Sequence, residues 1–337
     1  MPIPLIFIGI AAATGAFGIG KTIKAGADQK EANETNKEAN ITIRNATNKI
    51  NRYRKNCRDA IENLGMCKIK ILDGSIKPFI IEFEKLNNVE FTRSKGLEEL
   101  KNIVLDKNGF GNLKKMQSMA SSMLGGLVSG TMTGAITAFG AYGAAGVLAT
   151  ASTGTAISSL SGVAATNATL AFFGGGSLAA GGLGMAGGTA ILGGLVVGPA
   201  LAVMGVVMGA KASVNKDKAY SNLIDAESYR EKMNAAALLC DGIIKKANLF
   251  NKFLLSLNSV FEPLIFEMSN IIRNKGTNFE NFSEKEKKVV AKAMAIAGAI
   301  KSIIDTPILD KNGKITAEST KVIEKVNSQF FLNEVYD

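Results

Sequence analysis

Two segments of the chain place apolar or small residues at alternating spacings of four and three. This spacing keeps one stripe of each helix facing a partner helix, as in coiled coils. We therefore predict two long helices that pack against each other, the second of which contains Pro263, a residue that can kink a helix. The first series is Ala39, Ile43, Ala46, Ile50, Tyr53, Cys57, Ala60, Leu64 and Cys67. The second is Ala226, Tyr229, Met233, Ala236, Cys240, Ile243, Ala247, Phe250, Leu254, Leu257, Phe261, Leu264, Met268 and Ile271.

Shorter amphipathic stretches predict further helices. Ser283 with Glu286 three residues later forms a capping-box pattern at the start of one of them. The motif DKNG occurs at 106–109 and 310–313, and its glycine falls too early for an EF-hand calcium loop, so we interpret both copies as turns. The predicted helical stretches are 76–86, 97–105, 282–304 and 315–331.

Between the two long helices, residues 116–210 contain no charged side chain. This tract holds most of the chain's 36 glycines together with clusters such as LVV and FF. A flexible linker or a permanently buried core is the plainer interpretation. However, a linker would carry few such clusters, and a soluble helix of this length would show a polar face. No charge opposes entry into lipid, so we favour conditional or permanent membrane insertion.

Glycines four residues apart recur in the tract. Small residues at this spacing allow two helix backbones to approach closely, a packing mode favoured within membranes. We expect helix packing at these glycines and place two aromatic residues at a membrane interface. The candidate residues are Gly126, Gly130, Gly134, Gly184, Gly188, Gly194 and Gly198, with Phe172 and Phe173 at the interface.

The N-terminal sequence contains GAFGIGKT at 15–22, which matches the phosphate-binding P-loop pattern. A P-loop requires a preceding strand and a following series of strands and helices, whereas a heptad helix follows here. We therefore interpret residues 1–24 as an apolar helix with a basic end, which lacks the positive start of a secretory signal. Nucleotide binding through Lys21 and Thr22 stays open as an alternative.

The composition narrows the possible chemistry. The chain of 337 residues has no histidine and only three cysteines, none in a CxxC spacing. This argues against Ser-His and Cys-His catalysis, His-ligated zinc and a disulfide framework. We expect no enzymatic activity, no cofactor and no metal, and interpret the cysteines as small core residues of the helix seams.

The net charge of +10 includes a basic cluster on the first long helix. The plainer interpretation is a solvated helix face, and the functional one is contact with anionic lipid headgroups. A nucleic-acid partner is not expected, because no recognition motif accompanies the charge. The cluster is formed by Arg44, Lys49, Arg52, Arg54, Lys55 and Arg58.

The paired heptad helices around an apolar region resemble the helical pore-forming toxins of the cytolysin A and haemolysin BL type. This resemblance is of architecture over about residues 25–275, and the apolar region here is longer than the hairpin of that family. The stretch AATNATLAFFGGGSLAAGGLGMAGG resembles, in composition, the small interferon-inducible membrane proteins of animals. Together these likenesses imply a bacterial protein that acts on membranes, of toxin or phage-defence type.

We therefore expect an all-α protein, an elongated helical bundle with a Gly/Ala-rich apolar helical insertion. Its expected parts are 1–24, 25–115, the tract 116–210, and 211–337. The expected function is membrane insertion as a homo-oligomer that forms a pore or lesion, with the lipid bilayer as partner. A passive membrane-anchored coiled-coil scaffold is the main alternative. We expect the protein in the cytoplasm and at a membrane, the bacterial inner membrane in the first place.

Overall fold

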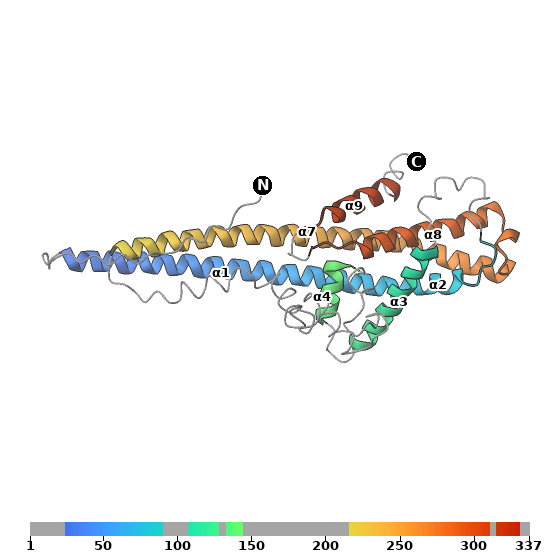
Figure 1. The fold of residues 1–337 in the computed structure, drawn as a ribbon, viewed down its shortest axis with the longest axis horizontal. Coiled ribbons are helices and arrows are strands. Elements are labelled where there is room, and N and C mark those ends of the chain that lie inside the picture. The colour runs from blue at the N-terminus through green and yellow to red at the C-terminus, as the bar shows by residue number, and fades with distance from the viewer. Residues whose placement is uncertain (1–23, 90–106, 128–132, 144–215, 311–314, 331–337) are drawn as a thin grey trace.

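The computed structural model describes residues 24–89, 107–127, 133–143, 216–310 and 315–330. Within these ranges every regular element is a helix, and the expected all-α class is confirmed. The two long helices are α1 (Lys24–Ile71) and α7 (Lys216–Lys275). Figure 1 shows them side by side along the long axis of the molecule, and both begin at the same end.

Helices α1 and α7 run parallel. Polar contacts fix their register: the Thr47 and Tyr229 hydroxyls lie 3.0 Å apart, and Lys49 Nζ donates to Asn234 Oδ1 at 2.9 Å. In this register the two heptad series superpose residue on residue, with Ile50 opposite Met233 and both buried. The packing of the two predicted helices against each other follows from this match, because each apolar layer of one helix meets an apolar layer of the other.

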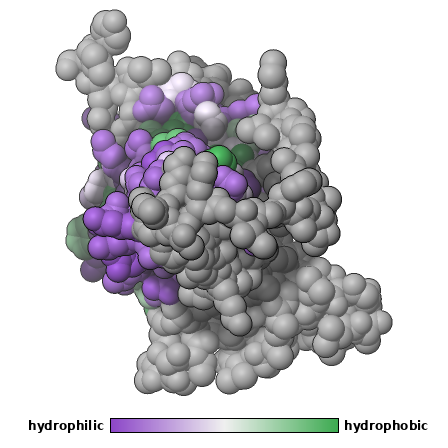
Figure 2. All heavy atoms as spheres, turned by 90° about the vertical axis from the view of Figure 1, so that its left-hand side faces the viewer, coloured by the Kyte–Doolittle hydropathy of each residue, from purple (hydrophilic) through white to green (hydrophobic). Residues whose placement is uncertain are grey.

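The seam residues are buried or half-buried along the whole length of both series. Cys57, Cys67 and Cys240 are buried and free, as expected for seam residues. Helix α7 continues through Pro263, which lies on its exposed side. At the end where the two helices begin, the described residues are predominantly hydrophilic on the surface (Figure 2).

At the far end α1 passes into a π-helical turn, η1 (Leu72–Ile76), and then into α2 (Lys77–Phe83). Phe79 is fully buried, and its ring centroid lies 5.3 Å from that of Phe261 on α7. A parallel bridge between Asn87 and Asn278 joins the segments that follow α2 and α7. The aromatic packing and this bridge hold α2 against α7.

Helix α3 (Lys107–Leu127) crosses the boundary at which charged residues end. The predicted turn at 106–109 is wrong from Lys107 onward, because these residues form the first turn of α3. Phe110 supplies a physical reason. The ring centroids of Phe110 and Phe83 lie 5.3 Å apart, and this aromatic contact stabilises the first turn of the helix despite the Asn-Gly pair.

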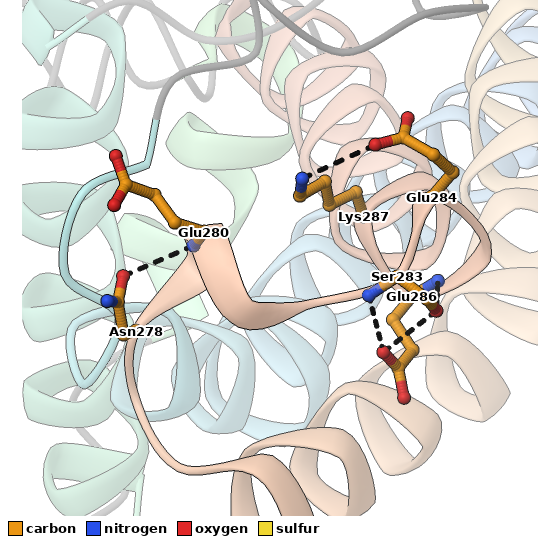
Figure 3. A network of polar contacts seen from close by, with 6 residues as sticks. All are labelled: Asn278, Glu280, Ser283, Glu284, Glu286 and Lys287. Atoms are coloured by element: carbon orange, nitrogen blue, oxygen red, sulfur yellow. Dashed lines mark hydrogen bonds and ion pairs between the residues drawn. The ribbon is translucent and has the colours of Figure 1, made fainter.

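Helix α8 (Glu284–Asp305) follows a short 3-10 turn, η6 (Phe279–Asn281), and packs on α7. The predicted capping box is confirmed: Glu286 N–H bonds to Ser283 Oγ, and Ser283 N–H donates to Glu286 Oε2 at 2.7 Å (Figure 3). The bond from the Ser283 N–H to the carboxylate, together with one from the Ser283 hydroxyl, holds the pKa of Glu286 below its usual range. Helix α9 (Ala317–Phe330) then follows, over the predicted stretch 315–331.

Candidate functional site: the docked segment of the uncharged tract

Part of the uncharged tract is packed into the helical bundle. The structure describes its residues 116–127, which complete α3, and 133–143, which form α4 (Thr133–Tyr142) with its cap. Helix α4 lies against α1 (Figure 1). Its side chains Ile136, Phe139 and Tyr142 are buried. This segment therefore shows how the bundle holds an uncharged helix.

At the contact between α1 and α4, backbone atoms of the two helices lie against each other with no side chain between them. A Cβ atom added to Gly140 would lie 2.1 Å from the carbonyl oxygen of Ile61, and one added to Gly65 would lie 2.1 Å from that of Ile136. Only glycine fits at both positions, since no real Cβ makes such a contact. The reciprocal pair Gly65 and Gly140 sets the closest approach of the two helices.

The C-terminal end of α4 is held by backbone hydrogen bonds. Gly143 has a φ of +66°, the left-handed conformation typical of a helix C-terminus, and its N–H donates to the Phe139 oxygen at 3.1 Å. The Ala141 oxygen accepts from the N–H groups of Ile308 and Leu309 at 2.8 and 3.1 Å. The chain just after α8 therefore pairs with the last turn of α4.

A buried lysine on α1 joins the ends of two helices. Lys68 is 0% exposed. Its Nζ donates to the carbonyl oxygens of Phe139 and Gly140 in α4 and of Ile304 in α8, each at 3.3 Å. The same nitrogen lies 5.5 Å from the centre of the Phe139 ring. The carbonyl groups at the two helix C-termini carry partial negative charge and offset part of the cost of burying this amino group.

Burial lowers the pKa of Lys68 to about 7, partly opposed by the charge of Asp305 and by Cys67. Asp305 itself pairs with Lys301, one turn earlier on α8. Burial also raises the pKa of Tyr142 to about 12, with a further contribution from Asp310. Burial therefore disfavours the charged forms of both Lys68 and Tyr142.

The structure places few of the sequence-predicted packing glycines. Gly126 lies in α3 and Gly134 lies in α4, so these two belong to different helices. The remaining candidates lie outside the described residues, as do the proposed nucleotide contacts Lys21 and Thr22. Outside them are Gly130, Gly184, Gly188, Gly194, Gly198, Phe172 and Phe173.

The basic cluster on α1 divides into exposed and buried members. Arg44, Lys49, Arg52, Lys55 and Arg58 are exposed. Arg54 is 7% exposed and faces the interior, so it does not contact lipid headgroups from this position as the sequence predicted. Its position explains this change, because it lies one helical turn before the seam residue Cys57, on the side of the helix that packs.

The heptad analysis did not single out Lys68, Gly65 or Gly140. A signal for Lys68 was present in the sequence. Its neighbours on the same helix face, three and four residues away, are Leu64, Gly65, Ile71 and Leu72, with no acidic partner among them. A lysine in such a setting is either exposed beside an apolar face or buried with carbonyl partners, and here it is buried.

Within the described parts of the chain, no cluster of acidic or cysteine side chains is arranged to hold a metal ion. None of the helices described there combines the length and the apolar character needed to cross a membrane. Comparisons with protein-family models, with curated proteins and with solved structures find no match. The physical features of the docked segment are therefore the basis on which a function can be proposed.

Proposed function

We propose that this protein inserts its uncharged tract into a lipid bilayer, as an oligomeric membrane-disrupting effector. The observation that carries the proposal is α4, a segment of the tract that lies buried in the bundle with its C-terminal carbonyls held by Lys68. The bundle shelters this described segment, and lipid is an alternative environment for the uncharged tract, because no charged side chain would have to leave water.

The contacts of α4 are compatible with its release from the helical bundle. Its closest contact with α1 is made by two glycines, which contribute shape and little apolar area. Its polar anchors are backbone carbonyls that accept from Lys68, Ile308 and Leu309. Release breaks a few hydrogen bonds and exposes a lysine to water, where its charge is better solvated. It also uncovers the buried side chains of Ile136, Phe139 and Tyr142, which lipid could cover again.

Lipid contact on the outside of the bundle has its own candidates. The five exposed residues of the basic cluster lie on one long helix, and each basic residue near an anionic bilayer contributes about 1 kcal/mol of attraction. Attraction of this kind would bring the bundle to the surface before the tract is released. It also predicts that binding weakens as salt rises.

A liposome experiment tests the proposal. Purified full-length protein is added to vesicles of anionic lipid that contain a self-quenching dye. We expect leakage, and we expect Gly140→Ala to leak several-fold faster because the added methyl group forces α4 away from Ile61. The matched control is Gly125→Ala, also in the tract, where an added Cβ meets nothing within 4 Å.

Helicity measured before mixing ensures that both variants are compared in the folded state. Absence of leakage with all three proteins overturns the proposed function. Vesicle binding without leakage supports the passive scaffold instead. Equal leakage by Gly140→Ala and Gly125→Ala shows that release of α4 does not control insertion.

A further inference from the structure

Two of the three cysteines face each other across the long coil. Cys57 on α1 and Cys240 on α7 occupy matching places in the superposed heptad series. They are 2% and 6% exposed, so neither side chain points to solvent.

The matching layers and the burial of both side chains place the two thiols next to each other in the seam. The Cys57 thiol donates a hydrogen bond to Cys240, which raises the pKa of Cys57 far above its usual value. The same bond, helped by the charge of buried Arg54 and opposed by burial, lowers the pKa of Cys240 to about 7. Cys240 is therefore the better nucleophile of the pair, and Cys57 holds its proton until the second step.

We propose that Cys57 and Cys240 form an intramolecular disulfide when the folded protein meets a peroxide, and that Cys67 takes no part. This is a modification site that does not depend on the proposed membrane function. It follows from two facing thiols on neighbouring helices, because a disulfide forms between side chains that the fold already holds together.

The chemistry balances with hydrogen peroxide as the oxidant. The Cys240 thiolate attacks one peroxide oxygen, the O–O bond breaks, and the hydroxide that leaves becomes water, which gives a sulfenic acid. Cys57 then loses its proton and attacks the Cys240 sulfur, the S–O bond breaks, and a second water leaves. Two thiols are oxidised and one peroxide is reduced to two waters.

Cys67 provides an internal contrast. It lies on the same seam of α1, but the residue opposite it in the superposed series is Phe250, which is fully buried. Burial raises the pKa of Cys67 to about 11, against the smaller effects of Lys68 and Lys70. It has neither a thiol opposite nor a readily formed thiolate.

The experiment counts and maps thiols. Full-length reduced protein at low concentration is treated with hydrogen peroxide, quenched, denatured and alkylated, and then digested without reductant for mass spectrometry. We expect two of three thiols to be lost and a linked pair of peptides that contain Cys57 and Cys240. A shift on a non-reducing gel at monomer size distinguishes a bond within one chain from a bond between chains.

The matched controls are Cys67→Ser, which should behave as the parent, and Cys57→Ser or Cys240→Ser, which should yield no linked peptide. Three alkylatable thiols after treatment, a bond that includes Cys67, or a bond only between chains overturns the inference. The parent protein alone decides this, so the result holds even where a serine variant folds poorly.

Discussion

At the scale of single residues, Lys68 is the most unusual group in the described structure. It is a lysine with full burial, and its three partners are backbone carbonyls at the ends of α4 and α8. Burial of the amino group costs desolvation free energy, and its attraction to the negative ends of two helices offsets part of that cost. Its charge is therefore linked to the docking of the uncharged segment.

This linkage predicts a pH dependence of stability. The pKa of Lys68 is about 7 in the folded protein and 10.5 by its ordinary value. Between these values the unfolded chain binds a proton that the folded chain lacks, so the free energy of unfolding should fall as pH drops from about 10.5 to about 7. We expect a loss of a few kcal/mol in urea denaturation, and Lys68→Met should remove most of this slope.

The matched control for this prediction is Lys70→Met. Lys70 lies two residues away on α1 and is exposed, so its replacement removes a lysine without removing the buried amino group and should leave the slope unchanged. A parent protein whose unfolding free energy is constant from pH 7 to 10 would show that Lys68 does not carry the effect.

At the scale of elements, the sequence was most informative where periodicity is strong. The alternating spacing identified both long helices, and Ser283 with Glu286 identified the start of α8. It could not identify α4 as a docked helix, because its fit depends on Gly65, which is distant in sequence. Glycine spacing within the tract gives no information about a partner outside it. At the first DKNG motif, aromatic packing of Phe110 on Phe83 favours a helix where the motif alone predicts a turn.

The contact between α1 and α4 makes a second prediction. Gly65→Ala should lower the free energy of unfolding by about 1–3 kcal/mol, because the added methyl group overlaps the Ile136 carbonyl. Gly111→Ala in α3 meets nothing within 4 Å and should be neutral or stabilise by up to about 1 kcal/mol. Denaturant titration of both variants tests this, and equal stabilities would contradict the close contact.

At the scale of the whole molecule, the parallel direction of α1 and α7 is the feature with the widest consequences. Five polar contacts along the coil agree with it, from Glu31 with Tyr220 to Ser75 with Glu262. The heptad series predicted that the helices would pair, but not their direction. Two apolar stripes can pair in either direction, and the register depends on matching layers along the whole length.

Chemical cross-linking tests the direction. An amine-reactive cross-linker should join Lys49 to Lys232 and Lys37 to Lys218 within one chain, since each pair lies at the same level of the parallel coil. Lys49 and Lys275 lie more than 40 residues apart along the coil, about 60 Å, and should not be joined. Linkage of Lys49 to Lys275 within a monomer would contradict the parallel arrangement.

The direction of the coil also bears on how the molecule could meet a bilayer. Gly143 lies beside the end of α8, whereas Lys216 begins α7 at the opposite end of the coil, about 50 Å away along α1. Residues 144–215 therefore connect two distant levels of the coil. If these residues enter lipid while the coil stays intact, a coil that lies flat on the membrane brings both levels to the surface. A coil that stands upright brings only its tip there, and about 15 extended residues would then have to run along the coil to span this distance.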